Sequence, residues 1–303
     1  MSFIALPTAI KANVDPKVAE ICMKATDFQG CVKSLSVPQR QDSNNKSEFD
    51  DALAFYKKGS SLRAIKSINS YLKKNPNSKE GFILSAIINA YDLGKFDEAI
   101  RDIDNAIDID KDYAYAHALK ADIFYWDLDG SLSKTLEYLE KGMNLSPEDP
   151  YINFIAGDIQ YDNGFVLLGG DTDNLSKKPK NKKELSLQSF EDAKKSFEKT
   201  LANIEKYKNT SAESTFPLGV TYTTNAILGD TKFELFKLYR DKKDRLMEKK
   251  YQNEAIEHYT KAISIAPSQE EAEKIELDRD FDLITPADLY RARGNVYSWM
   301  KNK

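Results

Sequence analysis

The sequence is poor in the residues that build catalytic and metal sites. Its 303 residues include only 2 His, 2 Cys and 2 Trp. Both histidines, His117 and His258, fall within expected helices, and no nucleophile elbow, phosphate-binding loop or metal-ligand cluster is present. Acidic residues are abundant, but on polar helix faces paired carboxylates are common without forming an acid–base pair. The sequence therefore predicts that the protein is not an enzyme and that it binds no cofactor, no metal and no small-molecule substrate.

Two further absences limit the partners and the membrane contact. The formal net charge is −4, so the chain lacks the excess of Lys and Arg that displaces counterions from nucleic acids. No run of about eighteen apolar residues is present, which excludes a membrane-spanning helix after the N-terminal segment. We therefore expect no nucleic-acid partner, and membrane contact that is peripheral at most.

The N-terminal region leaves its own processing open. Residues 1–12, MSFIALPTAIKA, hold a short apolar run that ends at small residues, as in the second half of a secretory signal, but they lack its charged start. The alternative is a disordered tail. With export, Cys22 and Cys31 would form a disulfide in a small helical hairpin over residues 13–35; without export they are two small buried side chains. Residues 36–46 are polar and predict a linker.

From residue 47 to residue 303 the chain repeats one pattern. A small residue is followed by an apolar or aromatic residue four positions later and by a proline or turn residue twelve positions later. Successive repeats are 35, 36, 58 and 62 residues apart, and they start at Ala64, Ala99, Thr135, Ala193 and Ala255. Self-similarity at about 34 residues is typical of stacked helical hairpins, because one hairpin cannot bury its apolar face alone. The two longer intervals indicate insertions, one of them at residues 165–184.

These motifs resemble the tetratricopeptide repeat family. Tyr290, Gly294 and Tyr297 match the spacing of the family's first helix, and Gly157 and Gly164 match its paired glycines. The resemblance implies an all-α, right-handed superhelical solenoid of antiparallel helix pairs, with about five to six units. It also implies that the first helix of each pair lines a concave groove that holds a protein or peptide segment.

The register of the family places the candidate partner-binding residues on those first helices. Aromatic side chains supply a large contact area at low entropy cost, and aspartates favour a basic partner. The candidates are Tyr91, Tyr115, Tyr125, Trp126, Tyr151, Phe154, Tyr161, Asp122 and Asp158. The alternative is that several of the aromatic rings pack between repeats and that the aspartates form a solvated helix face.

The leading hypothesis is a non-enzymatic scaffold that binds a protein or peptide partner of unknown identity and assists the assembly of a complex. One alternative is an enzyme with its site in the 165–184 insertion or the long fifth hairpin, marked by converging Asp, Lys or Tyr groups of perturbed pKa. Another is a self-associating spacer that makes contact through its last helix, with Tyr297 and Trp299 exposed.

A short N-terminal stretch bears on localisation. Residues 25–32, ATDFQGCV, resemble segments of cyanobacterial exported proteins. That resemblance implies a periplasmic or thylakoid-lumenal assembly factor. Without a signal sequence, the expected location is cytoplasmic.

Overall fold

The computed structural model describes residues 43–126, 132–169, 181–207, 219–272 and 284–301. The chain divides into two compact units, residues 1–48 and residues 49–303. The predicted signal segment, the cysteine hairpin and most of the predicted linker lie outside the described residues, so their assignments stay predictions. Helix α3 begins at Ser43, inside the predicted linker.

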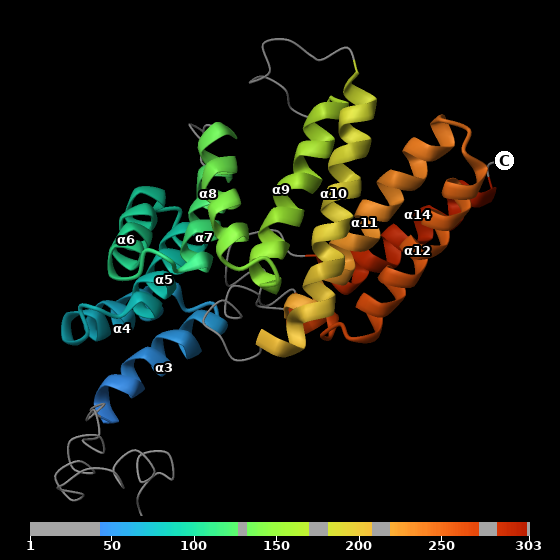
Figure 1. Ribbon diagram of the computed structural model, residues 1–303. Coiled ribbons are helices and arrows are strands. Elements are labelled where there is room, and N and C mark those ends of the chain that lie inside the picture. Colours follow the sequence, from blue (N-terminus) through green and yellow to red (C-terminus); the bar gives the residue numbers. More distant parts are fainter. Residues whose placement is uncertain (1–42, 127–131, 170–180, 208–218, 273–283, 302–303) are drawn as a thin grey trace, which may run out of the picture. The chain divides into compact units, whose positions relative to one another are not determined.

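The described chain consists of helices joined by turns, and no strand occurs within these ranges (Figure 1). The all-α array of helix pairs predicted from the repeat is confirmed. The helices are α3 (Ser43–Lys57), α4 (Ser61–Lys74), α5 (Lys79–Ile87) with the π-helical turn η1 (Ile88–Asp92), α6 (Phe96–Ile109), α7 (Ala114–Trp126), α8 (Leu132–Leu145), α9 (Pro150–Leu168), α10 (Lys182–Asn203) with the 3-10 turn η2 (Ile204–Tyr207), α11 (Val220–Asp241), α12 (Arg245–Ser264) and α14 (Pro286–Lys301).

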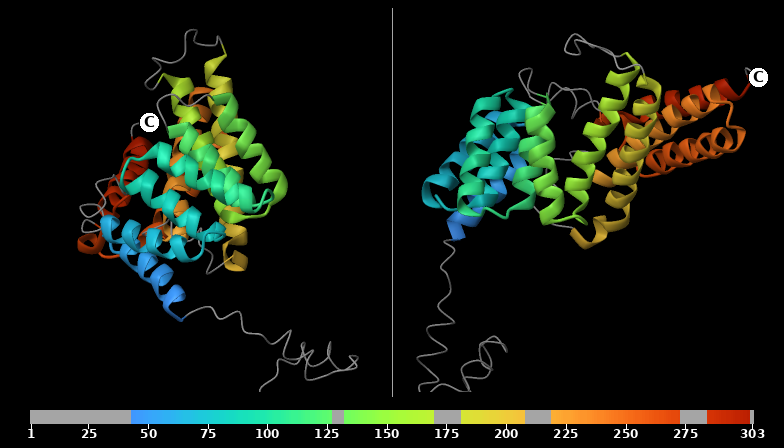
Figure 2. Two further views of the ribbon diagram at one scale, coloured as in Figure 1. Left: turned by 90° about the vertical axis from the view of Figure 1, so that its left-hand side faces the viewer. Right: turned by 45° about the horizontal axis from the view of Figure 1, so that its top comes forward.

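Each helix of the later repeats packs most closely on its partner in the same hairpin. Helix α7 pairs with α8, α9 with α10, and α11 with α12. Between hairpins, α7 contacts α9, α10 contacts α11, and α12 contacts α14, as the views in Figures 1 and 2 show. None of the described helices is both long and apolar enough to cross a membrane.

The residues that start the repeat pattern lie at the centre of this packing. All of them are fully buried, and so are most of the apolar or aromatic residues four positions later. The buried starting residues are Ala64, Ala99, Thr135, Ala193 and Ala255. The repeat in the sequence is therefore the repeat of one helix-to-helix contact.

Local chemistry sets the ends of α9. The Asp149 carboxylate accepts hydrogen bonds from the backbone N–H groups of Tyr151 and Ile152, at 2.9 and 3.3 Å, ahead of a proline in the first turn. The helix ends at Gly169, whose φ of 115° favours glycine. Helix α9 thus continues to Leu168, because the first residues of the predicted 165–184 insertion are apolar and prolong the buried face.

Two glycines explain how closely the later pairs approach. A Cβ atom built on Gly157 of α9 would lie 2.7 Å from the Phe197 ring of α10. A Cβ atom on Gly229 of α11 would lie equally close to the Tyr259 ring of α12, at 2.7 Å. In both units the aromatic ring of the second helix rests directly on the backbone of the first helix, where only glycine leaves space.

Candidate protein-interaction face

Three successive first helices place a small residue followed by aspartate at the same position of the repeat. These dipeptides are Ala121-Asp122 in α7, Gly157-Asp158 in α9 and Gly229-Asp230 in α11. In α9 and α11 the glycine faces the partner helix, so the aspartate, about 100° further around, points to another side of the helix. Helices α9 and α11 add a second carboxylate four residues later. We call Asp122, Asp158, Asp162, Asp230 and Glu234 the acidic face.

Asp122 is held by groups from two helices. The Tyr91 hydroxyl, from the π-helical turn η1, donates a hydrogen bond to one carboxylate oxygen. The Trp126 indole N–H, one turn further along α7, donates to the other oxygen at 3.2 Å. Burial raises the pKa of Asp122 to about 6, although both hydrogen bonds act in the opposite direction. The aspartate is thus desolvated, and its donors among the described residues are neutral.

Three other carboxylates of the acidic face also have donors. The Tyr125 hydroxyl of α7 donates to Asp162 of α9 at 2.6 Å, across the boundary between two repeats. The Tyr259 hydroxyl of α12 donates to Asp230 at 2.6 Å. Glu234 forms an ion pair with Lys237 on its own helix.

Asp158 differs from its neighbours. It is half-buried on α9, and within the described ranges no hydrogen bond or ion pair reaches its carboxylate. Burial, together with the charges of Asp122 and Asp162, raises the pKa of Asp158 to about 7. Like charges gather around a carboxylate with no partner in the described chain, an arrangement that an incoming cation would relieve.

The candidate aromatic residues divide by burial. Trp126 is 48% exposed, and Tyr91, Tyr125 and Tyr161 are half-buried beside the acidic face. Tyr125 and Trp126 meet edge to face, with ring centroids 5.3 Å apart.

Tyr115, Tyr151 and Phe154 are buried. The rings of Tyr115 and Tyr151 meet edge to face at 6.3 Å, and Phe154 packs on Phe197 at 5.6 Å. Tyr115 and Tyr151 therefore pack between repeats, as the alternative interpretation of the aromatic set expects, whereas Phe154 packs inside its own hairpin.

The sequence places Asp162 near the same face as Asp122 and Asp158, but Asp230 and Glu234 are not among the candidates. A signal for Asp230 was present, since a small residue followed by aspartate recurs in α7, α9 and α11. The insertions had shifted its spacing away from the regular repeat. For Glu234 the signal is its pairing with Asp230 at positions i and i+4, which lie on one face of a helix.

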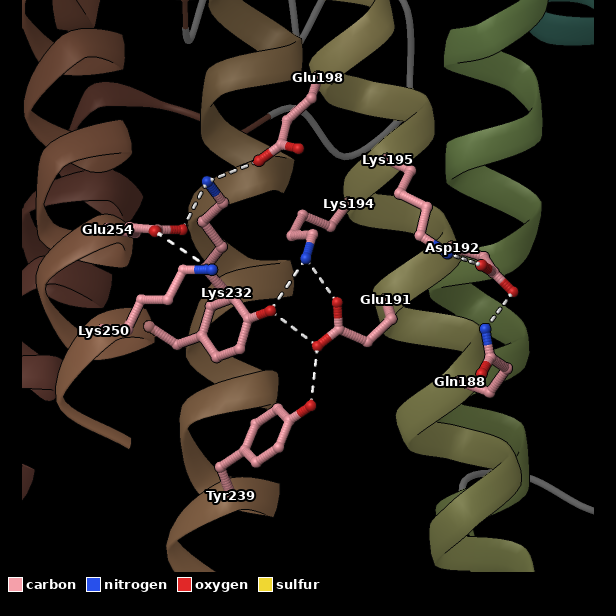
Figure 3. Close-up of polar contacts among 11 residues, drawn as sticks. Gln188, Glu191, Asp192, Lys194, Lys195, Glu198, Lys232, Tyr239, Lys250 and Glu254 are labelled. Carbon is pink, nitrogen blue, oxygen red and sulfur yellow. Dashed lines mark hydrogen bonds and ion pairs between the residues drawn. The ribbon is translucent and has the colours of Figure 1, made fainter. Parts of the chain in front are cut away.

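A second polar cluster joins α10, α11 and α12 (Figure 3). The Tyr251 and Tyr239 hydroxyls donate to one oxygen of Glu191, at 2.7 and 3.1 Å, and Lys194 pairs with its other oxygen. Burial opposes ionisation of Glu191, but the hydrogen bonds from Lys194 and Tyr251 outweigh it and lower its pKa. These are converging groups of shifted pKa, as the enzyme alternative requires. Each of these groups already has a hydrogen-bond or ion-pair partner within the cluster. A structural role, in which the cluster holds the three helices together, therefore explains their arrangement.

Beside that cluster, Lys232 of α11 is almost fully buried. Its ammonium group pairs with Glu198 at 3.0 Å and with Glu254 at 2.9 Å, and it donates to His258 Nε2 at 3.2 Å (Figure 3 draws both carboxylates). His258 Nδ1 donates in turn to Asn225 at 2.9 Å. Burial, and then the charge of Lys232, lower the pKa of His258 to about 4, so this imidazole is neutral and structural.

The other histidine is also in the core. His117 of α7 is buried, and its Nε2 donates to the backbone carbonyl of Lys111 at 2.9 Å. Burial lowers its pKa. His117 therefore connects its own helix to the turn that precedes it, which is a structural role.

Known proteins share the repeat sequence and the fold of this chain. A family model described as tetratricopeptide repeat matches residues 246–269, which cover most of α12 and the turn after it. A thermophilic TPR protein from Thermus thermophilus is structurally similar, with a TM-score of 0.50 and 15% sequence identity. That similarity covers 78% of this chain and 100% of the other chain. No curated protein sequence matches the chain.

Two further solved structures are more distant. MamA from Desulfovibrio magneticus RS-1 gives a TM-score of 0.38 at 15% identity and covers 74% of this chain and 95% of its own. A human IFIT1 dimer with m7Gppp-AAAA gives 0.40 at 16% identity and covers 90% and 65%. The tetratricopeptide repeat matched at residues 246–269, the buried repeat positions and the fold shared with the Thermus protein together show an all-α array of tetratricopeptide-like helix pairs.

Proposed function

We propose that this protein is a non-enzymatic scaffold whose acidic face binds a basic segment of a partner protein. The observation that carries the proposal is the environment of Asp158. Its carboxylate lies close enough to those of Asp122 and Asp162 for their charges to raise its pKa, and no described cation offsets them. Carboxylates with shifted pKa values are concentrated at functional sites, and a cationic ligand at this one would supply the missing charge.

The neighbouring side chains indicate which cation fits. The exposed Trp126 ring and the Tyr125 ring stand beside the carboxylates. An ammonium or guanidinium group between them gains an ion pair with Asp158 and a cation–π contact with an aromatic face. Lysine and arginine side chains have this chemistry, so the partner segment is basic.

The role in assembly follows from the form of the array. Repeated first helices offer equivalent positions along one direction, which suits an extended or helical segment better than a small ligand. A protein that holds a basic segment of another protein keeps it from unspecific contacts until the rest of a complex is in place. We therefore propose assistance in complex assembly as the use of this binding.

Binding of a basic peptide to charge variants tests the proposal. The probe is a fluorescent peptide of alternating Lys and Gly, with a Glu and Gly peptide of equal length as its counterpart. Asp158→Asn should weaken binding of the Lys peptide by about tenfold or more, because one close ion pair is lost. The Glu peptide should not bind.

The matched control is Asp97→Asn, which removes the same charge from the exposed surface of α6. This variant should bind the Lys peptide like the unmodified protein. Equal loss in both variants would mean attraction to net charge alone, and unchanged binding by Asp158→Asn would remove Asp158 from the site. Either result contradicts the proposal.

A further inference from the structure

Helix α14 carries an exposed stripe next to its buried side. Leu289 and Val296 are buried against the preceding hairpin. Tyr290, Gly294 and Tyr297, spaced by four and then three residues, share a face about 100° further around the helix, and the two tyrosines are 56% and 46% exposed. We call these three residues the α14 stripe.

Trp299 does not belong to this stripe. It is 41% exposed, but its ring packs edge to face on Phe233 and Phe236 of α11, each with centroids 6.2 Å away. The Arg240 guanidinium lies 5.2 Å from the same ring. The sequence grouped Trp299 with Tyr297 as a contact, whereas in the structure Trp299 attaches α14 to α11.

Gly294 lies at a position of the repeat that an aromatic ring covers in earlier units. The equivalent glycines, Gly157 and Gly229, each lie under an aromatic ring of a second helix. A Cβ atom built on Gly294 would meet no described atom within 4 Å. The α14 stripe therefore has the shape that accepts an aromatic ring, and within the described residues no ring is there.

We propose that two copies of this chain associate through α14, antiparallel, with Tyr297 of each copy resting on Gly294 of the other. One helix supplies both the glycine and the ring, three residues apart. A twofold axis then makes both contacts at once, which is the self-complementarity that a symmetric dimer requires. The contact repeats between copies the packing of Phe197 on Gly157 inside the chain.

Charge along α14 favours this occupant. An antiparallel copy sets the two helix dipoles against each other, so the positive N-terminal end of one helix lies near the negative C-terminal end of the other. In the register that pairs Tyr297 with Gly294, Arg291 stands opposite Met300 of the second copy, and no two like charges face each other.

Arg293, near the α14 stripe, already has partners within the chain. Arg293 donates a hydrogen bond to the Thr260 hydroxyl of α12 at 3.2 Å, and its guanidinium lies 5.4 Å from the Tyr290 ring centroid. Arg291 pairs with Asp288 on its own helix. The arginines of α14 therefore leave the centre of the stripe free for an aromatic contact.

Sedimentation equilibrium of the full chain tests the proposal. A single helix pair buries less than about 1,200 Å², so we expect a reversible dimer with a dissociation constant in the micromolar range. Gly294→Ala should raise that constant about tenfold, because the new Cβ atom takes the place of the incoming ring. The free chain should remain at least as stable in thermal unfolding, since the methyl group meets no described atom and alanine favours helix.

Tyr297→Ser should also weaken the dimer about tenfold, through loss of the ring itself. The control is Leu246→Ser, which removes another exposed apolar side chain, 80% exposed on α12, and should leave the dimer unchanged. A chain that stays monomeric at all concentrations would overturn the proposal. So would a dimer that Gly294→Ala and Tyr297→Ser both leave intact.

Discussion

At the scale of the residue, Asp158 is the clearest departure from ordinary packing. The other carboxylates of the acidic face have a tyrosine, a tryptophan or a lysine as donor, whereas Asp158 has none among the described residues. The raised pKa of Asp158 affects the stability of the folded chain as well as its binding of a cation. The folded chain binds a proton at this carboxyl more tightly than the unfolded chain does.

The sign of the resulting pH dependence follows from the two pKa values. The ordinary pKa of 3.8 applies to the unfolded chain, and the folded value is about 7. The stabilising contribution of protonated Asp158 is fully present below the lower value and is lost as the pH rises through the higher one. Asp158→Asn should remove this dependence, so relative to the variant the unmodified protein should lose about 2–3 kcal/mol between pH 5 and pH 8.

Urea unfolding of both proteins at the two pH values measures this difference. Asp97→Asn, on the exposed surface of α6, serves as control and should follow the unmodified protein at both. A difference between Asp158→Asn and the unmodified protein that does not change with pH would show that Asp158 has an ordinary pKa.

The environment of Asp158 was beyond prediction from the sequence, although the residue itself was a candidate. Its character depends on which carboxylates receive a hydroxyl group. The donors Tyr91 and Tyr125 come from the preceding units, whereas Tyr259 comes from the second helix of the same hairpin as Asp230. Only the packed array decides those pairings.

At the scale of the element, the contact between a first-helix glycine and a second-helix ring is the repeating unit of the later repeats. The sequence pattern predicted the helix pairs because each start of the pattern is a buried contact point. It was less informative about the insertion at 165–184. Helix ends there depend on how far the apolar face continues, and α9 extends to Leu168 while α10 begins at Lys182.

The glycine contact predicts opposite effects for one substitution at two equivalent positions. Gly157→Ala would place a methyl group 2.7 Å from the fully buried Phe197 ring. It should destabilise the chain by about 1–3 kcal/mol, because the ring has to move in a packed core. Gly294→Ala, with no described neighbour within 4 Å, should be neutral or stabilising for the free chain.

Urea unfolding of the two alanine variants, at a concentration where the chain is monomeric, measures this contrast. The unmodified chain provides the reference. If both variants change the free energy of unfolding by the same amount and in the same direction, the glycines do not mark equivalent positions with different surroundings.

At the scale of the whole molecule, the net charge of −4 conceals a local concentration of negative charge. The acidic face extends over the first helices α7, α9 and α11. The pKa of the Tyr161 phenol is raised, mainly by burial and in addition by the charges of four carboxylates of the acidic face. Association with a basic segment should therefore weaken as salt screens these charges. The α14 stripe, by contrast, is mainly apolar, so self-association and partner binding involve different helices and different forces.

Carbon-13 NMR of the Asp158 carboxyl group in the full chain, with and without the Lys peptide, measures whether a basic segment binds at the acidic face. We expect a midpoint near pH 7 in the free protein, because burial and the charges of Asp122 and Asp162 raise the pKa of Asp158 to about 7. The midpoint should fall clearly when the Lys peptide binds, because the bound cation stabilises the carboxylate. A bound peptide that leaves the midpoint of Asp158 unchanged would contradict binding at the acidic face.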